Sequence, residues 1–503
     1  MSASRQRSGR GPGLAITLAL VASGFSLSPS PSHAQQGATP FSFQAANARL
    51  NEISNVRRAS GADLTAAREQ ARAVATLNRP TIAVDAQVLR YEKSFDISAA
   101  DALGEAGSVA NQLLPGVLGD LPGVAPDVLQ AINDRLAAAL PEFFASLPGV
   151  RLRFSDTVFR PVLTGVMPIY TGGAIPALRD AAGAQIEMAR ARQSEASNLE
   201  SVNLVRAYFG QTLTREALTI ARDTRDGLDL HLHNAEAMER EGFLSKGQRM
   251  QVQVARDAAQ RQVDRAELEH GTAVQSLARL LDVPAGVAPT SPLFVNSTSP
   301  GPVGDFIQAA EGGNPGIVQA EAGRDLAEAG VKLARSRQRP TVFAFGAYNL
   351  NQKQALPIEP DWIVGVGARY TLMSSLDRGR LVSAARARSQ AAEQLERQAR
   401  DDVQMLVIRA YNLVELARRQ FLSLDSSLEA ARENLRIQDL SFREGEASAS
   451  SVIDANNLLG AARLQRAAAA YEYDLALAGL LAASNRSDEF LDYFTRADRV
   501  LTP

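Results

Sequence analysis

Two kinds of hydrophobic pattern alternate along the chain. In stretches of about ten residues, apolar side chains return at every second position, as at Ile82, Val84 and Val88. In much longer stretches they return at steps of three and four, as from Val205 to Phe209. The first period is that of a half-buried strand and the second that of an amphipathic helix. The chain is therefore predicted to combine short strands with very long helices.

The strands are expected at four places. Their predicted positions are residues 80–91, 150–166, 340–350 and 361–373. The second face of each strand carries small or polar residues, which is typical of strands that cross a membrane in a barrel. A soluble hairpin that lies on the helices is the alternative reading of the same pattern.

The helical stretches are unusually long. They are expected at residues 50–77, 174–240, 243–281, 307–337, 380–443 and 452–483. A helix that spans 174–240 would be on the order of 100 Å long. No globular core covers such a helix, so it requires coiled-coil partners, and its Ala-rich faces suit close packing on more than one side.

The chain contains two copies of one sequence pattern. The dipeptide Arg79-Pro80 recurs 260 residues later as Arg339-Pro340. Arg206-Ala207-Tyr208 recurs 203 residues later, and Arg240-Glu241-Gly242 recurs as Arg443-Glu444-Gly445 at that same offset of 203. Each copy has the same order of a helix, two strands and a long helix pair. A repeat of this kind predicts two similar structural units.

The change of offset places an insertion in the first copy. The second copy crosses the gap between its strands in about ten residues, whereas the first uses residues 96–149, where Leu-Pro-Gly occurs three times. A long connection without structure is unusual, so we expect this insertion to be partly helical and folded over the outer mouth. A surface insertion with no role in gating is the alternative.

These boundaries give the domain organisation. Residues 35–283 form the first repeat, 284–304 a linker rich in Pro, Gly and Ser, 305–486 the second repeat and 487–503 a tail. Residues 1–34 are expected to be a cleaved signal peptide, because three arginines precede a short apolar core and Ser32-His33-Ala34 is a small-x-small cleavage site. The apolar core is too short to span a bilayer as a helix.

Composition narrows the class of protein. Lys and Arg number 53 against 55 Asp and Glu, for a net charge of −2, which excludes a strongly basic nucleic-acid binder. The chain has no cysteine, so disulfides, cysteine nucleophiles and thiolate metal sites are excluded. With the signal peptide, this composition suggests a bacterial exported protein.

No catalytic, cofactor-binding or metal-binding constellation is visible in the sequence. The P-loop pattern is absent, and no glycine fingerprint lies between a strand and a helix. His231 and His233 are two residues apart, which places them on different faces of a helix, and His270 stands alone. All three are predicted to be surface histidines. We therefore expect no enzyme activity and no cofactor.

The order of these elements resembles the TolC-type outer-membrane efflux proteins over essentially the whole mature chain. Residues 168–173, Pro-Ile-Tyr-Thr-Gly-Gly, match the family pattern between the second strand and the next helix. The second copy departs from it, with Leu372-Met373-Ser374-Ser375 and a displaced Gly379. Ala207-Tyr208-Phe209 and the Leu-Leu pair at 280–281 also fit.

The resemblance implies a mixed α and β membrane protein of the Gram-negative outer membrane. Each chain of a homotrimer would give four strands to a 12-stranded β-barrel and its long helices to a periplasmic α-helical barrel of coiled-coil hairpins. Four strands alone leave an open edge that cannot lie in outer-membrane lipid, so three chains would close the barrel. The channel would be passive, with a periplasmic adaptor (membrane fusion) protein and an inner-membrane RND or ABC transporter as partners.

The resemblance also points to candidate site residues. The two Arg-Glu-Gly turns would lie at the periplasmic aperture, where the adaptor docks. The residues expected to contact it are Gly242, Phe243, Lys246, Gly445 and Glu446. Gln248 and Ser451 stand where family members often carry Asp, and Asp454 matches a family acidic position. A ring of three Asp454 carboxylates would favour cations, although Asp454 could instead cap or pair near a helix start.

The expected function is export of drugs or other small toxic compounds from an inner-membrane pump to the exterior. The conduit of a type I protein secretion system is the first alternative. A soluble periplasmic coiled-coil protein would lack the four strands, and an envelope fibre would show uninterrupted heptads.

Overall fold

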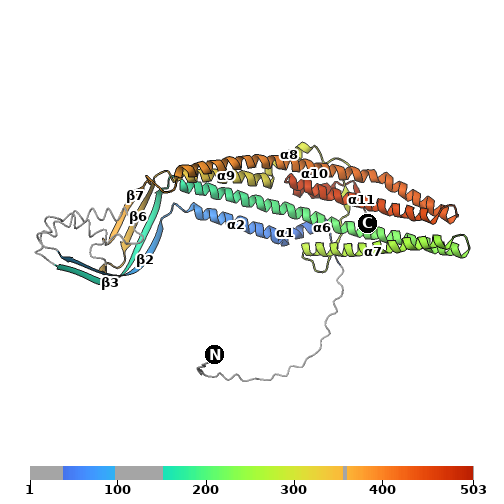
Figure 1. The fold of residues 1–503 in the computed structure, drawn as a ribbon, viewed down its shortest axis with the longest axis horizontal. Coiled ribbons are helices and arrows are strands. Elements are labelled where there is room, and N and C mark those ends of the chain that lie inside the picture. The colour runs from blue at the N-terminus through green and yellow to red at the C-terminus, as the bar shows by residue number, and fades with distance from the viewer. Residues whose placement is uncertain (1–37, 97–150, 355–359, 502–503) are drawn as a thin grey trace, which may run out of the picture.

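The computed structural model describes residues 38–96, 151–354 and 360–501 (Figure 1). Within these ranges the chain forms a four-stranded sheet at one end and long helices that run away from it to two hairpin turns at the other end (Figure 1). The expected signal peptide and the insertion beyond residue 96 lie outside the described residues.

The four strands lie where the period-two pattern predicts them. They are β2 (Thr81–Asp96), β3 (Arg151–Tyr170), β6 (Thr341–Asn349) and β7 (Trp362–Arg369). The sheet is antiparallel throughout in the order β2-β3-β6-β7, so β2 and β7 are its edges. The register pairs Val84 with Leu163, Leu163 with Tyr348 and Tyr348 with Trp362.

The long helices form two hairpins. The first consists of α6 (Ala174–Arg240) and α7 (Lys246–Leu280), and the second of α10 (Arg378–Arg443) and α11 (Ala449–Ala483). Both α6 and α10 are much longer than their partners, so their sheet-side halves pack on other helices. Those helices are α1 (Phe43–Ile53), α2 (Asn55–Ala75), α8 (Val303–Gly313) and α9 (Pro315–Ser336). None of the described helices is long and apolar enough to cross a membrane.

The helical stretches expected at 50–77 and 307–337 begin earlier and are each two helices. The chain breaks at Ser54 and at Asn314, whose side chains cap the helices that follow. Ser54 Oγ accepts from the Arg57 N–H at 3.0 Å, and Asn314 Oδ1 accepts from the Gly316 N–H at 2.8 Å. Each break therefore replaces helical hydrogen bonds with a side-chain cap.

The segment expected to be a linker is part of the central core. Its strands β4 (Val287–Pro289) and β5 (Leu293–Val295) pair with β1 (Thr39–Phe41) and with β8 (Arg499–Leu501). The C-terminal tail adds η2 (Ser487–Glu489) and α12 (Phe490–Thr495) beside them. We use "central core" for the buried cluster that these segments form with the middle of α6, α10 and α11. Aromatic rings fill it, with Phe43, Phe209, Phe294, Phe490 and Tyr473 among its members.

Two repeated tyrosines attach the long helices to this segment. The Tyr208 hydroxyl in α6 donates to the Phe41 carbonyl at 2.7 Å and accepts from the N–H groups of Thr290 and Ser291 at 3.1 and 2.9 Å. Its counterpart in α10, Tyr411, donates to the Gly301 carbonyl at 2.8 Å.

Two arginines follow the same repeat. Arg215 in α6 donates to the Pro289 carbonyl, and Arg418 in α10, 203 residues later, donates to the Ser297 carbonyl. Equivalent helix positions thus bind successive parts of one chain segment, which holds the two repeats together.

The Tyr208→Phe variant is expected to lower the free energy of unfolding by about 2 kcal/mol, because the buried Ser291 N–H loses its partner. The Thr290 N–H and the Phe41 carbonyl keep their own hydrogen bond at 3.0 Å. Tyr411→Phe is the matched control, since Tyr411 is only half-buried and its loss should cost less than half as much. Thermal unfolding in detergent measures both variants. Equal destabilisation by the two would contradict the role assigned to Tyr208.

Candidate functional site: the sheet face and the hairpin tips

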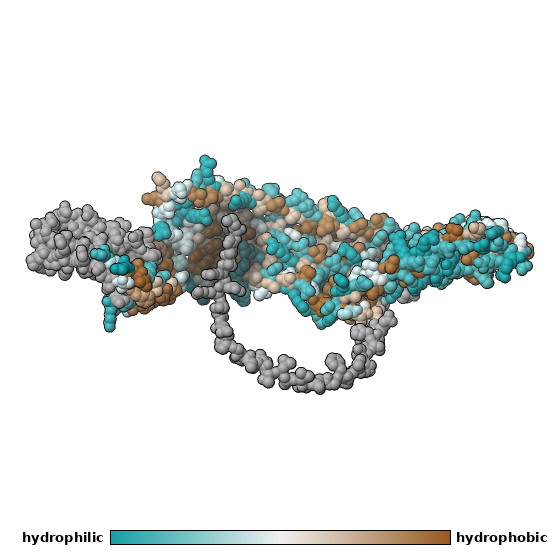
Figure 2. Space-filling view, turned by 60° about the horizontal axis from the view of Figure 1, so that its bottom comes forward, coloured by the Kyte–Doolittle hydropathy of each residue, from teal (hydrophilic) through white to brown (hydrophobic). Residues whose placement is uncertain are grey.

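One face of the sheet is apolar and exposed. Val84 on β2 and Val364 on β7 are 60% and 75% exposed, and the register brings Tyr348 and Gly346 of β6 to the same face. Figure 2 shows hydrophobic side chains at the sheet end of the molecule, whereas the hairpin end is largely hydrophilic. An apolar sheet face of this size left open to solvent marks an interaction surface.

Aromatic residues bound this apolar face along β7. Trp362 and Tyr370, 65% and 57% exposed, are eight residues apart, which corresponds to about 26 Å at the rise of a strand. That length matches the apolar band of a transmembrane strand, with aromatic residues at its two margins. The sheet therefore has the dimensions of a membrane-crossing layer.

The opposite face of the sheet is more polar and closely packed. The Thr164 hydroxyl donates to Asp85 Oδ2 at 3.0 Å across β2 and β3. On β6 the two phenylalanines, Phe343 and Phe345, lie on this face and not on the apolar one. The sequence of β6 alternates too weakly to predict which face they occupy. Phe345 covers Gly365, where an added Cβ would lie 2.7 Å from the ring, so the glycine makes room for the phenylalanine.

The two helical hairpins reverse at the far end from the sheet through the same turn. Gly242 and Gly445 have φ angles of 82° and 78°, the left-handed conformation that favours glycine. The Phe243 N–H donates to the Met238 carbonyl and the Glu446 N–H to the Ser441 carbonyl, both at 2.8 Å. Each turn is a Schellman motif, which satisfies the last carbonyls of the first helix.

Two of the three residues expected at the aperture, Gln248 and Ser451, lie at the caps of α7 and α11. Ser245 and Ser448 cap α7 and α11, and Gln248 closes a capping box because its Oε1 accepts from the Ser245 N–H at 3.0 Å. Ser451 occupies the equivalent position and lies 2.9 Å from the Ser448 hydroxyl. Asp454 is exposed on α11, and neither caps a helix nor pairs with any of the described residues.

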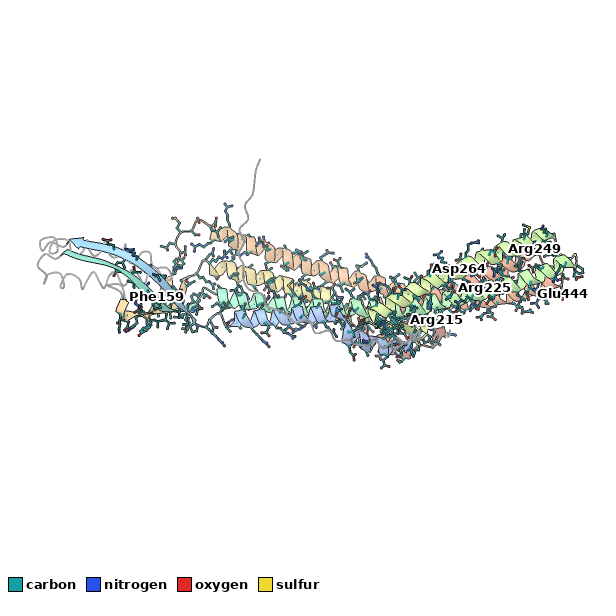
Figure 3. All side chains as sticks on the ribbon, turned by 90° about the horizontal axis from the view of Figure 1, so that it is seen from below. Phe159, Arg215, Arg225, Arg249, Asp264 and Glu444 are labelled. Carbon is teal, nitrogen blue, oxygen red and sulfur yellow. The ribbon has the colours of Figure 1, made fainter. Side chains whose placement is uncertain are left out.

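A small core joins the two tips. It consists of Ala235 of α6, Val252 of α7, Phe442 of α10, and Ala449 and Val452 of α11. Outside it, Phe243 is 79% exposed, and Lys246 and Glu446 are also exposed. Figure 3 shows Glu444 and Arg249 at this end of the molecule, far from Phe159 on the sheet. The tips therefore pack against each other and expose different side chains, apolar and basic at Phe243 and Lys246 on the first and acidic at Glu446 on the second.

His231 lies at the base of this core, which corrects the prediction of a surface histidine. Its side chain is 7% exposed, and its Nδ1 is 3.6 Å from Asp439 Oδ1 on α10. Arg443 binds the other carboxylate oxygen of Asp439 at 2.7 Å. Burial lowers the pKa of His231, with Asp439 acting in the opposite direction and Arg443 adding to the decrease. The histidine is buried because α6 of the first hairpin packs against the second hairpin here, with the His231 ring 6.3 Å from that of Phe442. His233 is exposed, and His270 is half-buried.

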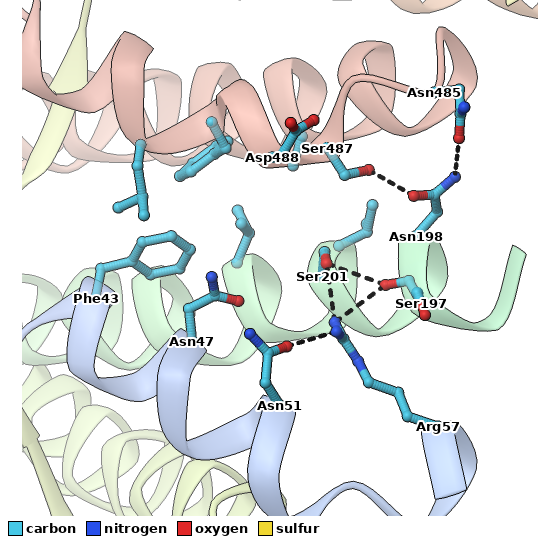
Figure 4. A pocket seen from close by; sticks show the side chains of 15 residues that line it. Phe43, Asn47, Asn51, Arg57, Ser197, Asn198, Ser201, Asn485, Ser487 and Asp488 are labelled. Atoms are coloured by element: carbon cyan, nitrogen blue, oxygen red, sulfur yellow. Dashed lines mark hydrogen bonds between the residues drawn. The ribbon is translucent and has the colours of Figure 1, made fainter. Parts of the chain in front are cut away.

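A cavity of about 280 Å³ lies beside the central core, between α1, α6 and the C-terminal tail (Figure 4). Most of its polar side chains bond one another. Arg57 donates to Asn51, to Ser201 and to the Ser197 carbonyl, and Asn198 bonds Ser487. These groups already have partners. Their hydrogen bonds connect the N-terminal helices and the C-terminal tail to α6.

Comparison with known proteins agrees with this geometry. Residues 306–486 match the outer membrane efflux protein family. Protein CyaE of Bordetella pertussis is 28% identical over 265 residues, which cover 50% of this chain and 54% of that protein. The chain thus spans about half the length of this relative.

Solved structures share the fold over most of the chain. CusC has a TM-score of 0.68 at 14% identity and covers 88% of this chain and 91% of its own. The CmeC outer membrane channel of Campylobacter jejuni has a TM-score of 0.68 at 11% identity, and the match covers 91% of this chain and 90% of that one. The open state of the MtrE outer membrane channel of Neisseria gonorrhoeae has a TM-score of 0.65 at 16% identity, and the match covers 88% of this chain and 89% of that one.

An amphipathic four-stranded sheet continued by two long helical hairpins defines a TolC-like fold. The chain resembles the outer membrane efflux protein family in its second repeat and shares this fold over most of its length. That family consists of outer-membrane channels that extend into the periplasm. Its members form trimers and work in tripartite systems.

An arginine on the apolar sheet face is expected to weaken membrane assembly. Ala344 pairs with Val366 on this face, so Ala344→Arg should cost about 2–4 kcal/mol near the middle of the apolar band. Ala347→Arg is the matched control on the opposite face of the same strand. Outer-membrane yield of the folded protein measures both, and equal yields would show that the faces are wrongly assigned.

The packing of the tips is expected to loosen as the pH falls. The folded-state pKa of His231 lies below its ordinary 6.5, so the loosened state binds the proton first. The stabilisation is fully present above pH 6.5 and is lost as the pH falls toward the folded pKa. The protection factors for hydrogen exchange at 228–240 and 436–446, which correct for the slower intrinsic exchange in acid, should therefore decrease on acidification. His231→Gln should abolish that dependence. His233→Gln should retain it; loss of the dependence in both variants would exclude His231 as its origin.

Proposed function

We propose that this protein is the passive outer-membrane export channel of a tripartite efflux system and carries drugs or other small toxic compounds from an inner-membrane pump to the exterior. The observation that carries the proposal is the separation of two surfaces. A sheet with one apolar face lies at one end of α6 and α10, and two matched hairpin tips lie at the other end, on the order of 100 Å away. One chain thus reaches from a membrane to a periplasmic partner.

A homotrimer follows from two unpartnered surfaces. The edges of β2 and β7 are unpaired among the described residues, and an open strand edge is not tolerated in lipid. Three copies would close a barrel of 12 strands. The helices also leave apolar side chains exposed, such as Leu395, Leu406 and Leu413 on α10, at 67%, 51% and 56%. Neighbouring copies would bury these side chains in a helical barrel.

The hairpin tips are the docking surface for a periplasmic adaptor protein in this proposal. The contacts would involve Gly242, Phe243 and Lys246 on the first tip, and Gly445 and Glu446 on the second. An adaptor would in turn link the channel to an RND or ABC transporter, which supplies the energy. Asp454, with Ser451 and Gln248 nearer the turns, would line the periplasmic aperture, and its carboxylate is free of internal partners among the described residues.

The cargo is tested in a host that lacks its own outer-membrane efflux channel. The protein is expressed there together with an adaptor and pump, and both resistance to small toxic compounds and release of a type I secreted polypeptide are measured. Restored resistance is the expected result. Release of the polypeptide without any gain of resistance would show that the cargo is a polypeptide and not a small compound, while the proposed role as an export channel would stand. Failure of both, with a folded outer-membrane trimer, would contradict the proposal.

Valine at either turn glycine is expected to abolish export while the trimer stays intact. The left-handed backbone costs about 1–2 kcal/mol for an ordinary residue and more for a β-branched one. Nothing lies within 4 Å of the Cβ position at Gly242 or Gly445, so the backbone is the source of the cost. Gly242→Asn and Gly445→Asn are the matched controls, because asparagine tolerates this conformation.

Export of a fluorescent dye from cells measures these variants, beside the amount of trimer in the outer membrane. Full export by both valine variants would remove the turns from the docking surface. Loss of export in the asparagine variants as well would show that the glycine matters for contact and not for conformation.

A further inference from the structure

The two repeats differ where the sheet passes into the long helix. Tyr170-Thr171 and Tyr370-Thr371 are 200 residues apart, whereas the ends of the two helices, Arg240 and Arg443, are 203 apart. The second copy therefore carries three extra residues between the strand and the helix. We call the segment from Thr371 to Asp377 the junction loop.

The first copy makes this connection with a tight turn. Gly172 and Gly173 have φ angles of 64° and 97°, and α6 begins at the next residue. A Cβ on Gly172 would lie 2.6 Å from the Ser336 carbonyl oxygen, so the turn packs closely on the end of α9. The first connection exposes no large apolar side chain beyond Tyr170.

The junction loop instead presents apolar side chains outward. Leu372 and Met373 are 85% and 91% exposed, more than any other large apolar residue of the described chain, and Leu376 is 53% exposed. They continue directly from the aromatic margin of the apolar sheet face at Tyr370. The loop is therefore an extension of that face toward the helices.

The base of the loop is fixed. The Arg378 guanidinium donates to the carbonyls of Thr371 at 2.7 Å and Leu372 at 3.4 Å, and to the carbonyl of Arg337 at 3.1 Å. The Leu376 N–H donates to the Ser374 hydroxyl at 3.2 Å. One arginine thus binds the loop to the end of α9, so that its apolar tip is held away from the protein.

The surroundings of the loop are basic. The chain segments that meet at its base carry Arg335 in the last turn of α9, Arg337 and Arg339 after that helix, and Arg378 and Arg380 at the start of α10, whereas the loop itself has one acid, Asp377. Asp377 is occupied by Arg380 at 3.1 Å. The side chains of Arg335 and Arg337 are exposed and bind none of the described residues. Exposed apolar side chains with two unpaired arginines nearby match a lipid interface with anionic headgroups.

We propose that the junction loop is a lipid anchor, in which Leu372 and Met373 enter the periplasm-facing leaflet of the outer membrane and the adjacent arginines bind the phosphates of anionic phospholipid. The inference rests on the proposed function, because it takes the apolar sheet face to be the membrane-crossing face. Continuity with that face and the charge of the surroundings select phospholipid as the partner. The loop sets how deep the channel sits in the membrane.

Depth measurements in vesicles test the anchor. The chain has no cysteine, so Met373→Cys gives a single labelling site in the full protein. The labelled trimer is reconstituted in vesicles with spin-labelled lipid, with Val366→Cys on the sheet face and Phe243→Cys at the hairpin tip as references. We expect quenching at position 373 to be at least about half of that at 366 and far above that at 243.

The arginines are tested in the same vesicles. Phosphatidylglycerol should increase quenching at position 373, and Arg337→Gln should remove that increase. Arg432→Gln is the matched control, an exposed arginine on α10 far from the sheet. An equal loss in both variants would contradict a specific role for the arginines near the loop.

The outcomes separate the anchor from the channel. Quenching at 366 without quenching at 373 would overturn the anchor and leave the proposed function standing. Cross-linking of the cysteine at 373 to a second copy would show that a neighbouring protomer covers the loop, which also overturns it. Absence of quenching at both 366 and 373 would contradict the membrane-crossing face itself.

Discussion

The rest of the structure depends on the fact that α6 and α10 are far longer than any core one chain can build around them. The central core covers only their middle, where Phe209 of α6 and Phe421 of α10 are completely buried. Towards the sheet they pack on α2 and α9, and towards the tips on α7 and α11. Their remaining apolar side chains stay exposed, as does the apolar face of the sheet. A chain with this much exposed apolar surface is suited to assembly with other copies and to contact with lipid.

The internal repeat explains how so extended a chain holds a defined shape. Equivalent residues of the two copies, Tyr208 with Tyr411 and Arg215 with Arg418, bind the segment that connects the copies. The hairpin turns repeat the same Schellman motif and the same serine cap. Differences between the copies are therefore informative. They are concentrated at the ends of the molecule, in the contrasting tip residues and in the junction loop, where partner and membrane would be met.

Much of the fold follows from the sequence because its local signals are strong. The α6 boundaries at 174 and 240 are predicted to the residue, since a Gly-Gly pair precedes the helix and Gly242 follows it. The breaks at Ser54 and Asn314 were not predicted, because the apolar period continues through both. The strands at 287–289 and 293–295 are too short to show alternation, and only their partners bury them.

The candidate sites could be located but not characterised from sequence. The turn glycines stand out through the repeat, whereas the burial of His231 depends on where the second hairpin packs. Asp474 of α11 is similar: it is fully buried in the central core, and this burial raises its pKa well above the usual range.

The central claim is that the protein is an outer-membrane trimer, and its most direct test is the mass of the protein extracted from outer membranes in mild detergent. The account predicts three chains of 53.7 kDa, less any cleaved signal peptide, and a monomer in the soluble periplasm would contradict it.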